Sequence, residues 1–317
     1  MADRTSSLIN RRAMLGVLGG SAVAGALPAA PLLPSPALQL DMDKPEDNLT
    51  AWMKMRASLE SQDVYFWFTG GLDLAAPGKA IRPIINVETV ILRRTQRLGA
   101  HAWHVTDWEA SIYRDVESDE IVDEVVNPVT GDKVRPFHYR EGPVTFDYNA
   151  ERQPRLVGLP TPFEEKTEPF HQRWRQAGDD LWMVKEMYIW GIPQWLDIKQ
   201  FPDETPKTPI NVSSITTMKS SLRDVLDPAL ASVPTEYFYQ ATSDWLPWMK
   251  MGQRPGFVVW HEAGKKLFSL DDLPSTTRTA MEKIHPQWFA RPVPWEGFTN
   301  MFFLYRQKYG RKTAVAE

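Results

Sequence analysis

Residues 84–93 read IINVETVILR, and this alternating stretch decides the fold. Every second residue falls on one face of an extended chain, and that face is apolar apart from one threonine: Ile85, Val87, Thr89 and Ile91. The opposite face carries Asn86 and Glu88. An apolar face opposite a polar face is typical of a strand buried on one side only. The sequence therefore predicts a half-buried β-strand here.

The same period of two recurs along much of the chain. Gly70-Gly71 is expected to break the first strand, Asn127-Pro128-Val129-Thr130-Gly131 is a strong turn signal, and Ala263-Gly264 predicts the turn of a hairpin. Asn149–Asp180 lacks periodicity and is predicted to be a long lid-like loop. Further strands, together an antiparallel meander, are predicted over Val64–Phe68, Trp103–Tyr113, Glu120–Val126, Val134–Tyr139, Leu181–Trp190, Asn211–Ser220, Glu236–Thr242, Gly256–Glu262 and Lys265–Phe268.

Helical spacing appears only near the two ends of the chain. Asp47–Gln62 repeats apolar residues every three to four positions, and Ser275–Ile284 ends before Pro286. A last aromatic stripe spans Phe298–Tyr309. We therefore expect a mainly β (α+β) fold with an N-terminal helix and two C-terminal helices. Its core is an antiparallel curved sheet or a barrel of the calycin or lipocalin kind.

The first 37 residues are expected to be an export signal and linker, followed by one domain over residues 38–317. Asn10-Arg11-Arg12-Ala13-Met14-Leu15 resembles a twin-arginine motif, and an uncharged stretch follows it. That stretch is too short and glycine-rich to span a bilayer stably, so we expect cleavage and no stable membrane span afterwards. An ordinary secretory signal or a retained anchor are the alternatives. The predicted location is periplasmic or secreted, with the twin-arginine machinery as partner of the precursor.

Composition excludes several classes of protein. A net charge of −4 without a basic cluster argues against binding to nucleic acid. The absence of cysteine excludes disulfides, thiolate nucleophiles and iron–sulfur clusters. His101, His104 and Asp107 are spaced by three, but a strand points such residues to opposite faces, so no metal site is predicted. Without a phosphate-binding loop or dinucleotide motif, no cofactor is expected.

Several landmarks follow one another in a fixed order, and that order matters more than any one of them. They are Val64–Gly70, Tyr113-Arg114-Asp115 before Asn127–Gly131, Trp245–Gly252 before Gly264-Lys265, and Trp295–Phe303. Together they resemble the DUF1838 family of bacterial proteins, many of which begin with twin-arginine signals. The resemblance covers nearly all of the expected mature chain. Since the family is functionally uncharacterised, it implies no catalytic residues.

The 13 tryptophans suggest a binding site for a small apolar or aromatic molecule. Tryptophan joins a large apolar surface to one N–H donor, and it is enriched where such molecules are held. An ordinary core filled with indole rings is the alternative. The tryptophans expected to line the cavity are Trp67, Trp103, Trp182, Trp190, Trp245 and Trp248.

Carboxyl groups are the best candidates for chemistry. Strand alternation places Glu186 on one face with Trp182 and Trp190, where poor solvation would raise its pKa towards values useful for proton transfer. Glu186 is therefore the predicted general base, with Tyr188, Tyr113 or His104 as the proton donor. An ion pair with a neighbouring strand is the structural alternative. A second carboxyl pair, Asp107 and Glu109, would suit acid and base or a cation, although solvated strand charge is the simpler interpretation.

Two classes of function follow from these features. The first is an exported protein that holds a small apolar or aromatic molecule in an aromatic-lined cavity. It acts either as a cofactor-independent lyase or isomerase or as a non-catalytic periplasmic carrier. The second is an envelope interaction protein whose tryptophan-rich surface docks another chain, which predicts an exposed aromatic patch instead of a cavity.

Overall fold

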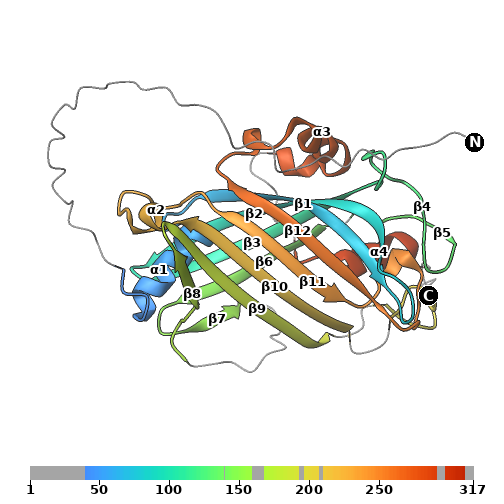
Figure 1. Ribbon diagram of the computed structural model, residues 1–317, viewed down its shortest axis with the longest axis horizontal. Coiled ribbons are helices and arrows are strands. Elements are labelled where there is room, and N and C mark those ends of the chain that lie inside the picture. Colours follow the sequence, from blue (N-terminus) through green and yellow to red (C-terminus); the bar gives the residue numbers. More distant parts are fainter. Residues whose placement is uncertain are drawn as a thin grey trace, which may run out of the picture. The chain divides into compact units, whose positions relative to one another are not determined.

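The computed structural model describes residues 40–138, 140–158, 168–192, 196–206, 210–290 and 297–310, with the side chains of residues 185–192 and 210–211 outside that description. Ten strands form one antiparallel sheet in the order β7-β6-β3-β2-β1-β12-β11-β10-β9-β8 (Figure 1). Their bounds are β1 (Asp63–Ala75), β2 (Arg82–Gly99), β3 (Ala102–Arg114), β6 (Arg140–Asn149), β7 (Arg152–Leu156), β8 (Trp174–Ala177), β9 (Asp180–Ile192), β10 (Ile210–Ser221), β11 (Glu236–Ser243) and β12 (Phe257–Leu267).

Four α-helices accompany this sheet in the described part of the chain: α1 (Pro45–Arg56), α2 (Leu222–Leu226), α3 (Ser275–Ile284) and α4 (Met301–Tyr309). The predicted fold class, mainly β with one N-terminal and two C-terminal helices, is confirmed. The bounds predicted for α3 are those observed. α1 ends six residues before the predicted Gln62, because the chain leaves the helix at Ala57 to enter β1.

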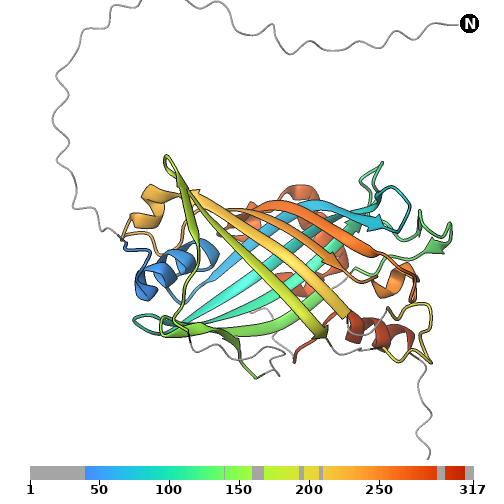
Figure 2. The same ribbon diagram turned by 60° about the horizontal axis from the view of Figure 1, so that its bottom comes forward.

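The sheet is strongly curved but not closed, so the predicted alternative of a barrel is wrong. β7 and β8 are its edges, and no ladder joins them in the described residues. Figure 2 shows the curl, with β9 and β10 arching over the side occupied by β3 and β6. Inside the curve, Trp52 of α1 packs in one cluster with Tyr148 of β6 and Met183 of β9. A helix placed there separates strands that a barrel would have to join.

Two glycine positions predicted as strand ends lie inside strands. β1 continues through Gly70-Gly71, and β12 continues through Ala263-Gly264, so the predicted hairpin is wrong. A Cβ atom on Gly70 would lie 1.8 Å from the carbonyl oxygen of His261, and one on Gly264 would lie 2.0 Å from that of Trp67. Glycine is needed here because the backbones of two neighbouring strands approach too closely for any side chain.

The predicted strands around the Asn127 turn are much shorter than expected. Only β4 (Val125–Val126) and β5 (Lys133–Val134) pair, as a separate two-stranded sheet, so the meander does not include them. The Asn127 side chain accepts hydrogen bonds from the backbone N–H groups of Val129 and Thr130, which confirms the turn itself. The predicted long loop contains β7 and β8, and its residues 159–167 lie outside the described ranges.

Three apolar clusters cover the sheet. The α1 cluster fills one end of the concave face and includes Trp52, Phe66, Phe68, Trp103, Tyr148, Met183, Met218 and Tyr237. The C-terminal cluster fills the other end and includes Leu72, Val87, Tyr113, Trp245, Trp248, Met301 and Tyr305. The outer cluster lies on the convex face beneath α3 and includes Tyr65, Leu92, Trp108, Ile112, Met281 and Trp288.

The expected signal, residues 1–37, lies outside the described ranges. Among the residues that are described, none of the helices has the length and apolar character needed to cross a bilayer.

Candidate functional site

The register of the sheet brings several polar residues to its concave face. Glu109 of β3 pairs with Glu141 of β6, and Glu262 of β12 pairs with Tyr239 of β11. Direct partners in an antiparallel ladder share a face, as do residues two apart on a strand. Glu109 therefore shares its face with Tyr113, four residues later on β3. It also shares this face with Phe66 of the α1 cluster, because Glu109 pairs with Ile91 and Ile91 pairs with Phe66.

These residues form a polar belt between two apolar ends. One end of the concave face is filled by the α1 cluster and the other by the C-terminal cluster. We define the polar belt as the hydrophilic residues between them, namely Thr89, Glu109, Ser111, Glu141, Tyr239 and Glu262. A hydroxyl chain runs through it, since Thr89 bonds to both the Ser111 hydroxyl (3.0 Å) and a Glu262 carboxyl oxygen (3.1 Å).

Glu262 is the most enclosed carboxyl group of the belt, with 8 % of its surface exposed. Burial, and then the nearby Glu109 carboxylate, raise the pKa of Glu262 to about 8, against the opposing effect of the Thr89 hydrogen bond. A carboxyl group with such a pKa is largely protonated at neutral pH. Glu262 can therefore donate a proton where an ordinary glutamate could not.

Glu141 and Tyr239 belong to the same electrostatic group. Partial desolvation, and then the charge of Glu109, raise the pKa of Glu141 to about 7; because Glu141 is exposed, solvent screens it more than it screens Glu262. Burial raises the pKa of Tyr239 well above its usual value, and the charges of Glu109 and Glu262 add to the effect. Glu141 also acts on Tyr239, although four strands separate β6 from β11 in the sheet order. The curl of the sheet brings the two sides of the belt together.

Asp107, two residues before Glu109, has a different environment. Its carboxylate accepts hydrogen bonds from Arg56 of α1 at 2.8 Å and from Arg93 of β2 at 3.2 Å. Arg93 is 2 % exposed, so the pair is a structural anchor between α1 and the sheet. Asp107 and Glu109, which lie two residues apart in the sequence, therefore have different surroundings: Asp107 forms ion pairs with the two arginines, and Glu109 belongs to the polar belt.

Tyr113 is fully buried at the end of the belt that adjoins the C-terminal cluster. Burial and the charge of Glu262 raise the pKa of its hydroxyl far above the usual value. The other predicted donor of this region is His104, which pairs with Asp147 of β6. Side chains alternate between the two faces of a strand, and His104 precedes Tyr113 by an odd number of positions, so it lies on the convex face. The structure does not bring these two candidates together.

The tryptophans expected to line one cavity are distributed over the fold. Trp103 belongs to the α1 cluster, whereas Trp245 and Trp248 belong to the C-terminal cluster. Trp67 packs against the outer cluster, and Trp182 stacks on Phe238 of the convex face at 6.3 Å between ring centres.

The remaining predicted residues are only partly described. Glu186, Tyr188 and Trp190 lie in β9, but their side chains are outside the described part of the structure. The backbone of Glu186 pairs with Ile215 of β10, whose side chain is 40 % exposed on the convex face.

Sequence reasoning missed Glu141, Glu262 and Tyr239. They come from β6 and from the consecutive strands β11 and β12, which follow much later in the chain, and none belongs to a local motif. A usable signal exists around Glu262, because alternate positions from Val258 to Lys266 all face the concave side. The turn predicted at Ala263-Gly264 concealed that alternation.

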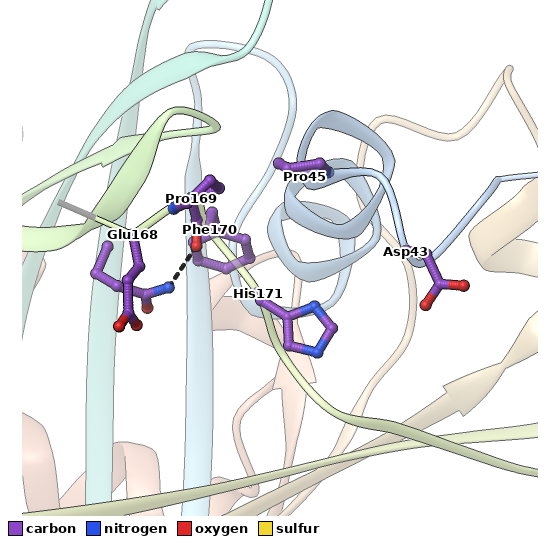
Figure 3. A pocket seen from close by; sticks show the side chains of 7 residues that line it. Asp43, Pro45, Glu168, Pro169, Phe170 and His171 are labelled. Carbon is purple, nitrogen blue, oxygen red and sulfur yellow. Dashed lines mark hydrogen bonds between the residues drawn. The ribbon is translucent and has the colours of Figure 1, made fainter. Parts of the chain in front are cut away.

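Surface hollows described in the structure lie away from the belt. One of about 530 Å³ is lined by Asp43, Pro45, Gln153, Glu168, Pro169, Phe170 and His171. Figure 3 shows Glu168, His171 and Asp43 spaced around it without a common centre, and the one bond drawn there runs from Gln153 to the carbonyl oxygen of Pro169. A second, of about 290 Å³, adjoins Trp103 and Arg97. Neither hollow places titratable groups against one another as the belt does.

The belt carboxyl groups are spaced as separate acids and bases. Within the described ranges, no three histidine, cysteine, aspartate or glutamate side chains lie close enough together to hold a metal ion. A carboxyl group whose surroundings raise its pKa to about 8, as those of Glu262 do, is suited to general acid catalysis.

Comparison with known proteins agrees with the resemblance found in the sequence. A search of curated proteins gave no match. Residues 61–308, from β1 to α4, match the family described as "Protein of unknown function (DUF1838)". This match covers the strands that carry the polar belt, and the chain belongs to the DUF1838 family.

Proposed function

We propose that the polar belt binds a small organic molecule and moves a proton within it, as a cofactor-independent lyase or isomerase. The observation that carries this proposal is the position of Glu262, an enclosed carboxyl group with a pKa of about 8 beside the Glu109 carboxylate. The two apolar clusters that flank the belt suit the hydrocarbon part of such a ligand.

The chemistry divides between the two carboxyl groups. Glu109 acts as the base and takes a proton from a carbon of the substrate. Glu262, protonated at neutral pH, donates a proton to another atom, either a second carbon in an isomerisation or a leaving group in an elimination. Tyr239, whose raised pKa keeps it protonated, remains a hydrogen-bond donor across the belt.

Deuterium exchange tests this function without knowledge of the natural substrate. The protein is incubated in D₂O with pools of small organic acids, ketones and terpenoids, and mass spectrometry detects any compound that gains deuterium. Glu109→Gln and Glu262→Gln are expected to abolish enrichment. Glu151→Gln, at an exposed position outside the belt, is the matched control and should keep it.

A non-catalytic carrier that binds its ligand at the polar belt gives a different result. Compounds in the pool that bind to it raise its unfolding temperature, but no compound gains deuterium with any variant. If no compound in the pool binds and none gains deuterium, the result would favour the alternative that the protein is an envelope interaction protein that docks another chain.

Export belongs to the same proposal. We place the protein in the periplasm or outside the cell, sent there by the motif at Arg11-Arg12. Replacing both arginines with lysine should keep the chain in the cytoplasm at its full length, as seen by fractionation and mass spectrometry. Unchanged export of that variant would assign the segment to another route.

A further inference from the structure

Two buried hydrogen-bond donors lie unused at one end of the belt. The hydroxyl of Tyr113 and the indole N–H of Trp248 have no hydrogen-bond partner of good geometry within the described residues. Tyr113 is fully buried and Trp248 is 1 % exposed. Leaving such groups unpaired in a protein interior is unfavourable, because they lose their hydrogen bonds to water and gain none in return. An uncompensated pair needs an explanation.

The two donors belong to one place. Their rings pack with centres 5.7 Å apart, and the Trp248 N–H lies near enough to the Tyr113 oxygen to influence its pKa. The indole N–H of Trp248 can only donate a hydrogen bond. If it donates to the Tyr113 oxygen, the proton of the Tyr113 hydroxyl still has no acceptor. The group that is missing is therefore an acceptor for the phenol proton, since none bonds to it among the described residues.

Their position relative to the carboxyl groups connects them with the chemistry. Tyr113 shares the concave face with Glu109, four residues earlier on β3. Through the ladder it also lies in the row of Val87, Gly70 and Glu262. In that row the fully buried Val87 and Gly70, which has no side chain, lie between Tyr113 and Glu262. Both Glu262 and Glu109 also act electrostatically on the Tyr113 hydroxyl.

We infer that the Tyr113 hydroxyl and the Trp248 N–H together bind a carbonyl oxygen, and that the polar belt acts on small carbonyl compounds. This inference rests on the proposed function, because it names the substrate class of the same site. Other indole N–H groups without partners, such as those of Trp67 and Trp288, lie with the outer cluster and have no belt carboxyl beside them.

The resulting step balances in protons and electrons. Glu109 removes a proton from the carbon next to the carbonyl group, that C–H electron pair forms a C=C bond, and the C=O pair moves onto oxygen. The two donors stabilise the enolate oxygen. In a β,γ-unsaturated carbonyl compound the product of this step is a dienolate. The oxygen pair then re-forms the C=O bond, the pair of the C=C bond just formed moves between the α and β carbons, and the electron pair of the original C=C bond takes a proton from neutral Glu262 at the γ carbon, which completes an isomerisation. Glu109 is left protonated and Glu262 ionised, and exchange with solvent restores both.

Matched ligands test the donor pair directly. The full chain is titrated with acetophenone and ethylbenzene, cyclohexanone and methylcyclohexane, and benzaldehyde and toluene, and the indole signals are followed by ¹H–¹⁵N NMR. The Trp248 signal is identified by its loss in Trp248→Phe. For at least one pair, the carbonyl member should move that signal and bind about 5- to 10-fold more tightly than its hydrocarbon partner.

Variants separate this role from a structural one. Tyr113→Phe should remove the preference for the carbonyl member, whereas Tyr305→Phe, at another buried tyrosine of the same cluster, should keep it. Because the Tyr113 hydroxyl is unpaired in the fold, its removal should leave the unfolding temperature unchanged or raise it. A lowered unfolding temperature, no preference in any pair, or a preference that survives in Tyr113→Phe would overturn the inference.

The two proposals fail in different ways. If carbonyl compounds bind through the donor pair but Glu109→Gln and Glu262→Gln leave deuterium exchange intact, the acid and base assignment is wrong and the binding inference stands. If exchange depends on both glutamates but not on Tyr113 or Trp248, the proposed function stands and the carbonyl pocket does not.

Discussion

The hydroxyl of Thr89 on β2 donates a hydrogen bond of 3.1 Å to the carboxyl group of Glu262 on β12, across the strand that lies between them. The intervening strand is β1, which has Gly70 directly opposite Glu262. A Cβ at that position would lie 2.7 Å from the Cα of Glu262 and 1.8 Å from the carbonyl oxygen of His261. The glycine thus allows the close approach of the two backbones beside this hydrogen bond.

The first prediction concerns the pH dependence of stability. The pKa of Glu262 is raised from 4.5 to about 8, so the folded protein binds more protons than the unfolded chain between those values. The free energy of unfolding should therefore be greatest at the acidic side of this window and fall as pH rises through it. A pKa difference of one between the folded and unfolded states corresponds to about 1.4 kcal/mol, which gives a loss of up to about 4 kcal/mol. Urea denaturation across the window measures it.

Two variants check that Glu262 is the cause. Glu262→Gln cannot ionise, so most of the slope should disappear. A smaller slope from Glu141 should remain, since its pKa of about 7 acts in the same direction. Thr89→Val removes the hydrogen bond that stabilises the ionised form, and should move the midpoint of the slope to higher pH. A slope that persists unchanged in Glu262→Gln assigns the effect to other groups.

The second prediction concerns Lys266, which is 4 % exposed. Its ammonium group donates hydrogen bonds to the backbone oxygens of Lys54, Met55 and Ala57, the last carbonyls of α1 and the residue after it. Lys266→Met should therefore lower the free energy of unfolding by about 2–4 kcal/mol, because buried acceptors lose their donor. Chemical denaturation measures the loss. The neighbouring Lys265 is exposed, and Lys265→Met should have little effect.

The third prediction concerns the close approach of β1 and β12. Gly70→Ala and Gly264→Ala each place a Cβ within about 2 Å of a backbone oxygen, 1.8 Å and 2.0 Å respectively, so the strands must move apart. We expect each to lower the free energy of unfolding by about 3 kcal/mol or more. Gly297→Ala meets no atom within 4 Å and serves as the control. Equal stability of all three variants would show that the sheet absorbs the clash.

Local pattern predicts β2 and β3 well as strands. The prediction that β2 is buried on one side only is wrong, because Val90 and Leu92 pack in the outer cluster on its other face. The alternation of residues 84–93 and of Trp103–Tyr113 corresponds to β2 and β3, and the helix predicted over Ser275–Ile284 is α3. The errors arise where tertiary contact decides. Gly264 looks like a turn residue in a single sequence, and only the presence of β1 beside it shows that it is a point of close approach.

The candidate site is harder to predict for the same reason. Glu109 stands beside Asp107 in the sequence, but Glu141 reaches it only through the β3–β6 ladder, and Glu262 only through the curl of the whole sheet. A carboxyl group acquires an unusual pKa from its surroundings, and those surroundings are assembled from distant strands. Strand patterns likewise could not decide barrel closure, because it depends on α1, which occupies the inside of the curve.

The last prediction distinguishes the two carboxyl groups that the sequence presents as a pair. Asp107 joins Arg56 and the nearly inaccessible Arg93, whose guanidinium also lies 4.4 Å from the ring centre of Phe66. Asp107→Asn leaves two cationic groups without their counter-charge, and should lower the free energy of unfolding by about 3 kcal/mol. Glu109 instead faces Glu141 directly, and opposed carboxylates destabilise a sheet.

Glu109→Gln removes the Glu109 charge, and it should lower the pKa of both Glu141 and Glu262 towards ordinary values. Infrared spectroscopy of the protonated carboxyl band, followed against pH, measures that change. The two variants thus separate structure from chemistry on one strand: Asp107→Asn loses stability, and Glu109→Gln loses deuterium exchange. If Glu109→Gln instead proves as destabilising as Asp107→Asn, Glu109 is a second structural anchor, and the belt has no base.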